Sequence, residues 1–244
     1  MVRGHIAVWL AGALLAAPPA QAQRMQGFAD VAADRDVVTL KVPGWMRGKI
    51  GSDGAARGSV RRKALGTSDL VDLFGLTVGG AERFGRFSFD IATDRADEAL
   101  VGDCIYDRTE RRVGVGALTI SQPLRPLLLR CRFERDGIAI GGMEIEAAPR
   151  TAALVQPSRR TGHVEMLGTR LGIESEHRMQ GAKVPTDAPV GYRFRSGDAS
   201  MGGVDLTGFN KRPLAMAKHG NERLAALAAG TALAVFWDPG DTND

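Results

Sequence analysis

The chain has 244 residues, of which 44% are hydrophobic and 25% are charged. This composition is typical of a globular protein and excludes disorder throughout the chain. The formal net charge is only +4, which is too small a bias to indicate a nucleic-acid-binding protein. Aromatic residues make up 6% of the chain, so a stacking platform for bases or sugars is not indicated either.

The first 22 residues have the three parts of a secretory signal peptide. Arg3 supplies the positive charge, residues 6–17 form the apolar run, and Ala20-Gln21-Ala22 fits a cleavage site. The apolar run is shorter than the ~20 residues that a transmembrane helix needs. We therefore expect cleavage after Ala22 and export to the periplasm or the exterior of a bacterial-type cell, with an uncleaved anchor as the alternative.

The next segment, residues 23–58, is predicted to be a tether followed by a flexible loop. Residues 24–36 have no clear period and suit a tether or a frayed helix. Residues 37–42 form one short β-rich run, and residues 48–58 are rich in glycine and charge, which is typical of a loop.

A single β-rich domain is predicted over residues 59–240. Phe87, Phe89 and Ile91 alternate with Ser88 and Asp90, the period-two pattern of a strand with one buried face. Similar runs continue through residues 100–120, and they predict several antiparallel strands.

The domain contains two cysteines, Cys104 and Cys131. In an exported protein an even pair predicts a disulfide, worth roughly 3–4 kcal/mol by the chain-entropy argument. A catalytic thiol is the alternative, but the sequence places no histidine or basic partner that would lower the pKa of either thiol.

An internal repeat is the most informative feature of the sequence. Residues 131–145 align without gaps on residues 192–206. Each copy is predicted to form a hairpin, because Asp136-Gly137 and Gly197-Asp198 occupy the same place and suit two-residue turns. The identical pairs are Arg132/Arg193, Phe133/Phe194, Gly141/Gly202 and Gly142/Gly203.

The apolar pattern slips by one residue within each copy. Pairing outward from the turns places Phe133 opposite Ile140 and Phe194 opposite Met201. A β-bulge at each Gly-Gly doublet would absorb the slip. Pairing would then resume with these neighbours: Cys131 beside Met143, Leu129 beside Ile145, Tyr192 beside Val204 and Val190 beside Leu206.

The C-terminal region differs in kind, because residues 224–237 are almost unbroken apolar sequence dominated by alanine and leucine. A helix over residues 222–237 is predicted, with Asn221 as N-cap and Pro239 after its end. Since this helix is apolar on every face, we expect it to be buried in the domain. A membrane-inserted tail is the alternative.

Duplicated hairpins at residues 129–145 and 190–206, followed by this apolar helix, resemble the tubby C-terminal-like group, which includes tubby, scramblase-type and LURP-one-related proteins. The resemblance covers residues 59–240 at the level of pattern and matches no signature motif. It implies a closed β-barrel around a central C-terminal helix and a role at anionic lipid. Since fold does not fix function, no binding residue is transferred.

The predicted fold class is therefore mainly β: an antiparallel barrel or curved sandwich with duplicated hairpins and one buried hydrophobic C-terminal helix. No catalytic, metal-binding or cofactor-binding motif stands out. The histidines of the domain lack metal-ligand spacing, and the nearest nucleophiles, Ser68 and Ser196, do not fit Gly-x-Ser-x-Gly. The histidines are His163, His177 and His219; a carboxylate group read as a solvated turn, with a calcium site as the alternative, comprises Asp90, Asp94, Asp97, Glu98 and Asp103.

Clusters of basic residues are the remaining candidate for function. If the fold brings these clusters together, they would form a surface for an anionic ligand such as lipid or an envelope polymer. The sequence thus favours an exported, non-catalytic envelope protein with an anionic or amphiphilic partner. An exported hydrolase with dispersed catalytic residues and a structural subunit of an envelope complex are the alternatives. The residues of the candidate surface are Arg61, Arg62, Lys63, Arg159, Arg160, Lys211 and Arg212.

Overall fold

The structure is a computed structural model that describes residues 24–44, 46–52, 56–73, 76–115, 118–148, 158–236 and 238. Within this part, the side chains of residues 64–73, 76–81, 96, 110–115 and 118–126 are not described. The predicted signal peptide, residues 1–22, lies outside the described residues.

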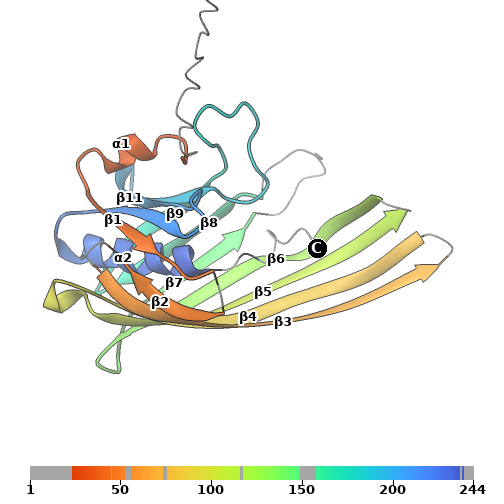
Figure 1. Ribbon diagram of the computed structural model, residues 1–244, viewed down its shortest axis with the longest axis horizontal. Helices are drawn as coiled ribbons and strands as arrows, with labels where there is room; N and C mark the ends of the chain where they lie inside the picture. The colour runs from red at the N-terminus through yellow and green to blue at the C-terminus, as the bar shows by residue number, and fades with distance from the viewer. Residues whose placement is uncertain are drawn as a thin grey trace, which may run out of the picture.

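The described chain forms a closed antiparallel barrel of twelve strands around a C-terminal helix (Figure 1). Each strand pairs with its neighbours in sequence, and β1 pairs with β12 to close the barrel. The predicted mainly β fold, an antiparallel barrel or curved sandwich, is therefore confirmed, and the structure is the barrel. The strands are β1 (Asp36–Lys41), β2 (Arg47–Gly51), β3 (Ala56–Leu73), β4 (Leu76–Thr93), β5 (Leu100–Val115), β6 (Leu118–Arg135), β7 (Ile138–Ala147), β8 (Arg160–Met166), β9 (Thr169–Glu176), β10 (Gly191–Ser196), β11 (Ala199–Asp205) and β12 (Lys211–Met216).

The helix α2 (Gly220–Val235) fills the barrel, and its residues from Arg223 to Val235 are all buried. Its small side chains let the walls approach closely: a Cβ on Gly230 would lie 2.3 Å from a methyl group of Leu214 on β12. The prediction of a buried helix is confirmed, although the helix begins two residues earlier than expected. Asn221 is not the N-cap, because it lies inside the helix and donates a hydrogen bond to the Leu167 carbonyl at 3.3 Å.

No helix in the described part of the chain has the length and apolarity needed to cross a bilayer.

The N-terminal segment contributes more structure than the sequence suggests. Residues 28–32 form a short helix, α1, whose Phe28 and Val31 are buried. The predicted loop over residues 48–58 is wrong in part, because β2 and the start of β3 belong to the barrel wall. Glycine and charge are compatible with these strands because one of their faces is solvated.

Both repeated hairpins are present, and each contains a bulge. Cys131 pairs with Met143 and Tyr192 with Val204, as predicted. The bulges lie one residue nearer the turn than expected: Phe133 faces Gly141 and Phe194 faces Gly202, so that Ile140 and Met201 are the additional residues.

The glycines have a different role, which is to allow close approach of the next strand. A Cβ on Gly141 would lie 2.0 Å from the Glu165 carbonyl, and one on Gly202 would lie 2.3 Å from the Ala215 carbonyl. In the first turn Asp136 and Gly137 both have positive φ, at 51° and 76°. In the second turn Gly197 has positive φ, at 56°.

Cys104 and Cys131 face each other on β5 and β6 and form the predicted disulfide, with an S–S distance of 2.05 Å. The bond joins two neighbouring strands inside the barrel wall. It closes a separation of 27 residues, which corresponds to roughly 3–4 kcal/mol by the chain-entropy argument.

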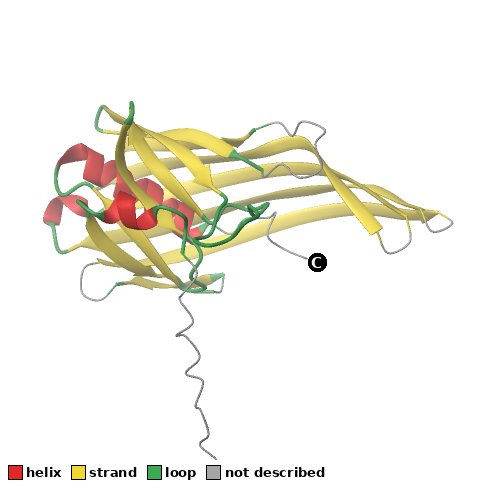
Figure 2. Ribbon diagram, turned by 90° about the horizontal axis from the view of Figure 1, so that it is seen from above, coloured by secondary structure: helices red, strands yellow, loops and turns green. Residues whose placement is uncertain are grey.

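Strands β3 to β6 are much longer than the others. They have 16 to 18 residues, whereas the other strands have 5 to 10. Their outer halves continue past the end of the barrel as a four-stranded curved sheet (Figures 1 and 2). We call this extension the arm; it comprises residues 63–73, 76–85, 107–115 and 118–127.

Candidate functional site

The outer surface of β2, β3 and β4 carries a dense group of exposed basic side chains. On β3 the buried Val60 points into the barrel, so its neighbours Arg61 and Lys63 point outward and are exposed. Directly opposite residues of an antiparallel pair share a face. We define the basic face by its six exposed members: Arg47, Lys49, Arg57, Arg61, Lys63 and Arg86.

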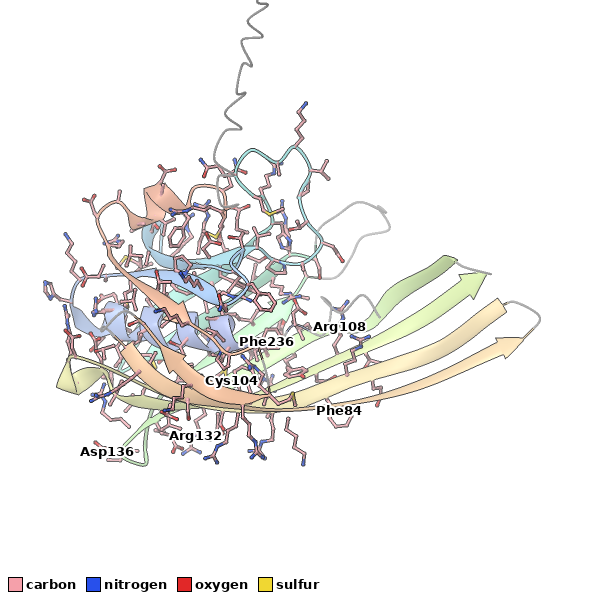
Figure 3. All side chains as sticks on the ribbon, viewed as in Figure 1. Phe84, Cys104, Arg108, Arg132, Asp136 and Phe236 are labelled. Atoms are coloured by element: carbon pink, nitrogen blue, oxygen red, sulfur yellow. A yellow bond between two sulfur atoms is a disulfide. The ribbon has the colours of Figure 1, made fainter. Side chains whose placement is uncertain are left out.

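Strand register brings these residues together. Arg47 on β2 lies directly opposite Arg61 on β3, and Lys63 lies directly opposite Arg86 on β4. The group continues round the barrel wall, because the exposed Lys41 on β1 faces Lys211 on β12. In Figure 3, side chains that end in nitrogen lie below β2, β3 and β4, on the side of the sheet away from α2.

Few acidic groups balance this charge. On the same face of the three strands, the described carboxylates are Asp90 and, towards the arm, Glu82. Asp90 accepts hydrogen bonds from the backbone N–H and hydroxyl of Ser59. None of the six members of the basic face forms an ion pair with a described residue. The exposed Phe84, 42% accessible, adds an apolar side chain at the border of the face.

Three of the seven predicted surface residues point inward instead. Arg62 donates hydrogen bonds to the Val235 carbonyl at 2.7 Å and the Pro43 carbonyl at 3.2 Å, so it caps the C-terminal end of α2. Arg62 and Arg212 line one cavity of about 210 Å³ at this end of the barrel. Burial, together with the charge of Arg212, lowers the pKa of Arg62.

Arg160 is the third inward residue and is only 2% exposed. Its guanidinium donates to the Tyr192 hydroxyl at 3.2 Å and pairs with Asp238. Burial acts to lower the pKa of Arg160, but Tyr192 and Asp238 outweigh it and raise the pKa. The adjacent Arg159 is exposed, before β8. Neither residue belongs to the basic face, because Arg160 is buried and Arg159 precedes β8, which is not adjacent to β2, β3 or β4 in the barrel.

A serine–histidine pair is present within the barrel wall. The Ser175 hydroxyl lies 2.9 Å from Nε2 of His177, and Nδ1 of His177 lies 3.0 Å from the Thr186 carbonyl. The Thr186 carbonyl fixes the tautomer, because Nδ1–H must donate to it and Nε2 must then accept from Ser175. The Ser175 oxygen also accepts the backbone N–H of Arg160 at 2.8 Å.

This pair serves structure better than catalysis. His177 is 5% exposed, and neither of the two cavities described here includes it or Ser175 in its lining. The backbone N–H of Thr186 also donates to the His177 carbonyl at 2.8 Å. The histidine thus fastens the loop after β9 to the barrel.

We expect the stability of the protein to fall as the pH drops below about 6.5, because of His177. Burial, with a contribution from Arg160, lowers the pKa of His177 below its ordinary value of 6.5. The unfolded chain then binds more protons than the folded chain, so stability rises with pH across this range and is lost on acidification. Urea unfolding from pH 5 to 8 measures this, with His177→Gln as the comparison. Equal pH dependence of the two proteins would contradict the assignment.

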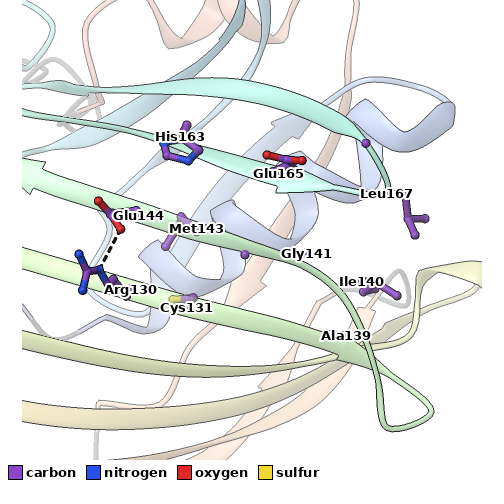
Figure 4. A pocket seen from close by; sticks show the side chains of 12 residues that line it. Arg130, Cys131, Ala139, Ile140, Gly141, Met143, Glu144, His163, Glu165 and Leu167 are labelled. Atoms are coloured by element: carbon purple, nitrogen blue, oxygen red, sulfur yellow. Dashed lines mark hydrogen bonds and ion pairs between the residues drawn. The ribbon is translucent and has the colours of Figure 1, made fainter.

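His163 lies in an open groove of about 550 Å³ on the outside of β6, β7 and β8 (Figure 4). Glu144 and Glu165 line the same groove, and Glu144 is paired with Arg130 at 2.8 Å. The described lining residues include no serine, so they do not form the serine–histidine–carboxylate set of a serine hydrolase.

The carboxylates after β4 are not simply a solvated turn. Glu98 is 3% exposed and accepts hydrogen bonds from Arg223 of α2 and from Thr93. Arg223 also donates a hydrogen bond to Asp36 at 2.7 Å. These ion pairs therefore connect the N-terminal end of α2 to the barrel wall. Among the described residues, no group of histidine, cysteine and acidic side chains could hold a metal ion.

The remaining candidate catalytic residues of the sequence analysis do not lie in a described site. His219 is the exposed residue before α2, and Ser196 is the exposed last residue of β10. The side chain of Ser68 lies outside the described part. Four members of the basic face, Arg47, Lys49, Arg57 and Arg86, were not among the predicted surface residues. The i, i+2 spacing of Arg47 and Lys49, which repeats that of Arg61 and Lys63, could have indicated the first two, whereas Arg86 joins the face through the register between β3 and β4.

Comparison of the chain with protein-family models, with curated proteins and with solved structures gave no match.

Proposed function

We propose that the protein is an exported, non-catalytic envelope protein that binds an anionic component of the cell envelope, a lipid surface or a polymer, through the basic face. The observation that carries this proposal is the collection of six exposed cations on three adjoining strands with two carboxylates on the same face. A single-sign surface of this kind attracts a polyanion over a Debye length of roughly 8–10 Å.

Geometry also favours an extended partner over a small ligand. The members of the basic face lie on the outer side of a curved sheet, and neither described cavity is lined by any of the six. Each basic residue near an anionic lipid surface is worth about 1 kcal/mol, so the affinity would come from the sum of many weak contacts. The exposed Phe84 at the border of the basic face suits a lipid layer, which has an apolar interior beneath its head groups.

An exported hydrolase remains a second candidate because of the Ser175–His177 pair. Neither of the two described cavities reaches this pair, so the binding role has the better support. The tubby-like resemblance is consistent with a lipid-facing role and supplies no residue to it.

The experiment is flotation of the predicted mature chain, residues 23–244, with anionic and neutral vesicles across a salt series. The strands of the barrel and α2 all lie after residue 35. We expect binding to anionic vesicles that weakens as salt rises, because exposed charges are screened. Binding to both kinds of vesicle regardless of salt would point to apolar insertion, and absence of binding would refute the lipid form of the proposal.

A further inference from the structure

The arm exposes one backbone edge that is able to pair with another strand. The Arg62 N–H donates to the Met46 carbonyl at 2.7 Å on the β2 side. The pairing of β3 with β4 has no register shift from Ala56 to Leu73. Backbone direction alternates along a strand, so the even-numbered residues of β3 direct their N–H and C=O groups to the β2 side throughout.

Beyond Arg62, no described strand lies on that side, since β2 pairs only with residues 57–61 of β3. The backbone N–H and C=O groups directed to this open edge belong to residues 64, 66, 68, 70 and 72 of the arm. Each presents a donor and an acceptor along an edge, which is the standard template for adding a strand. The sequence of β3 contains no proline, so no donor along this edge is missing.

The other edge of the arm is different. Strand β6 pairs with β7 only from Leu128 onward, and its outer part contains Pro123 and Pro126. Proline lacks the N–H and is a usual means of protecting an edge strand. Each chain therefore has one competent arm edge, whereas open-ended growth of a sheet needs two.

We propose that the β3 edges of two copies of this chain pair antiparallel about a twofold axis, which gives a closed dimer with a continuous eight-stranded arm sheet. A single self-complementary edge is satisfied by this symmetry and leaves no further growing edge. The occupant is thus a second copy, and the strand added to each copy is residues 63–73 of the other.

The dimer has a consequence for binding, which rests on the proposed function. The twofold axis of such a pair is perpendicular to the plane of the sheet, so the outer faces of both arms lie on the same side. The basic faces of the two copies could then bind the same flat anionic surface. Such bivalent binding raises the apparent affinity without any new contact.

Sedimentation velocity of residues 23–244 across a concentration series tests the dimer. We expect a monomer–dimer equilibrium for the unaltered chain and for Ser68→Ala, which keeps the N–H. Ser68→Pro removes a backbone N–H at the open edge and leaves the hydrogen bonds between β3 and β4 intact. It should raise the dissociation constant of the dimer at least about tenfold. Gly66→Pro, at a second outward position, should do the same, and circular dichroism identifies any variant that fails to fold.

A monomer at every concentration, or a dimer that tolerates both proline variants, would overturn the proposal. No vesicle is present in this measurement. Failure of the dimer and failure of anionic binding are therefore distinguishable.

Discussion

Replacing Glu98 with alanine should destabilise the protein by about 3–5 kcal/mol, because it leaves the charge of Arg223 buried without its main partner. The side chains of Arg223 and Glu98 are only 6% and 5% exposed. Asp36, the other acidic partner of Arg223, is 39% exposed and contributes less. Urea unfolding of Glu98→Ala and Arg223→Ala measures the loss.

A double variant supplies the control. In Glu98→Leu with Arg223→Met, both charges are replaced by apolar side chains of similar size, and such exchanges are often neutral or stabilising. We therefore expect the double variant to be more stable than either alanine variant. A double variant no more stable than the alanine variants would mean that the loss does not come from a buried charge left without its partner.

Removing residues 220–244 should abolish cooperative folding. About eight strands give a barrel whose interior side chains can fill by themselves, whereas this barrel has twelve strands and depends on α2. The helix supplies buried leucine and alanine residues to the same core cluster as the strands. Near-ultraviolet circular dichroism and urea unfolding test the truncated chain.

A shorter truncation provides the control. Removing residues 239–244 keeps α2 and also Asp238, which pairs with the buried Arg160, so this chain should unfold cooperatively. If the chain without α2 also gave a cooperative transition, the helix would not be the core of the barrel.

The local features of the fold could be predicted because they are recorded in short sequence patterns. The alternation of Phe87, Phe89 and Ile91 fixed a buried face, and all three are 2% exposed. The repeat gave two hairpins with their bulges, although it could not place each bulge to the residue. The requirement for glycine at positions 141 and 202 comes from a neighbouring strand, which a local pattern does not reveal.

The candidate surface was harder to predict because neighbouring residues on a strand point to opposite faces. Arg61 and Lys63 face solvent, while Arg62 shares the inner face with Val60. In the same way, Arg160 shares the inner face of β8 with Val164. The period-two rule could have separated these residues, but the pairing of Arg61 with Arg47 and of Lys63 with Arg86 depends on register between strands.

The measurement that tests the account most directly compares two charge variants of equal net charge on anionic vesicles. Arg61→Glu with Lys63→Glu reverses two charges of the basic face. Arg170→Glu with Lys183→Glu reverses two exposed charges on β9 and the loop after it. We predict that the first variant loses about 2–4 kcal/mol of binding free energy, a thirtyfold or greater drop in partitioning, because each charge near the surface is worth about 1 kcal/mol. The second should bind nearly as well as the unaltered chain, and equal losses in the two variants would contradict a binding site on the basic face.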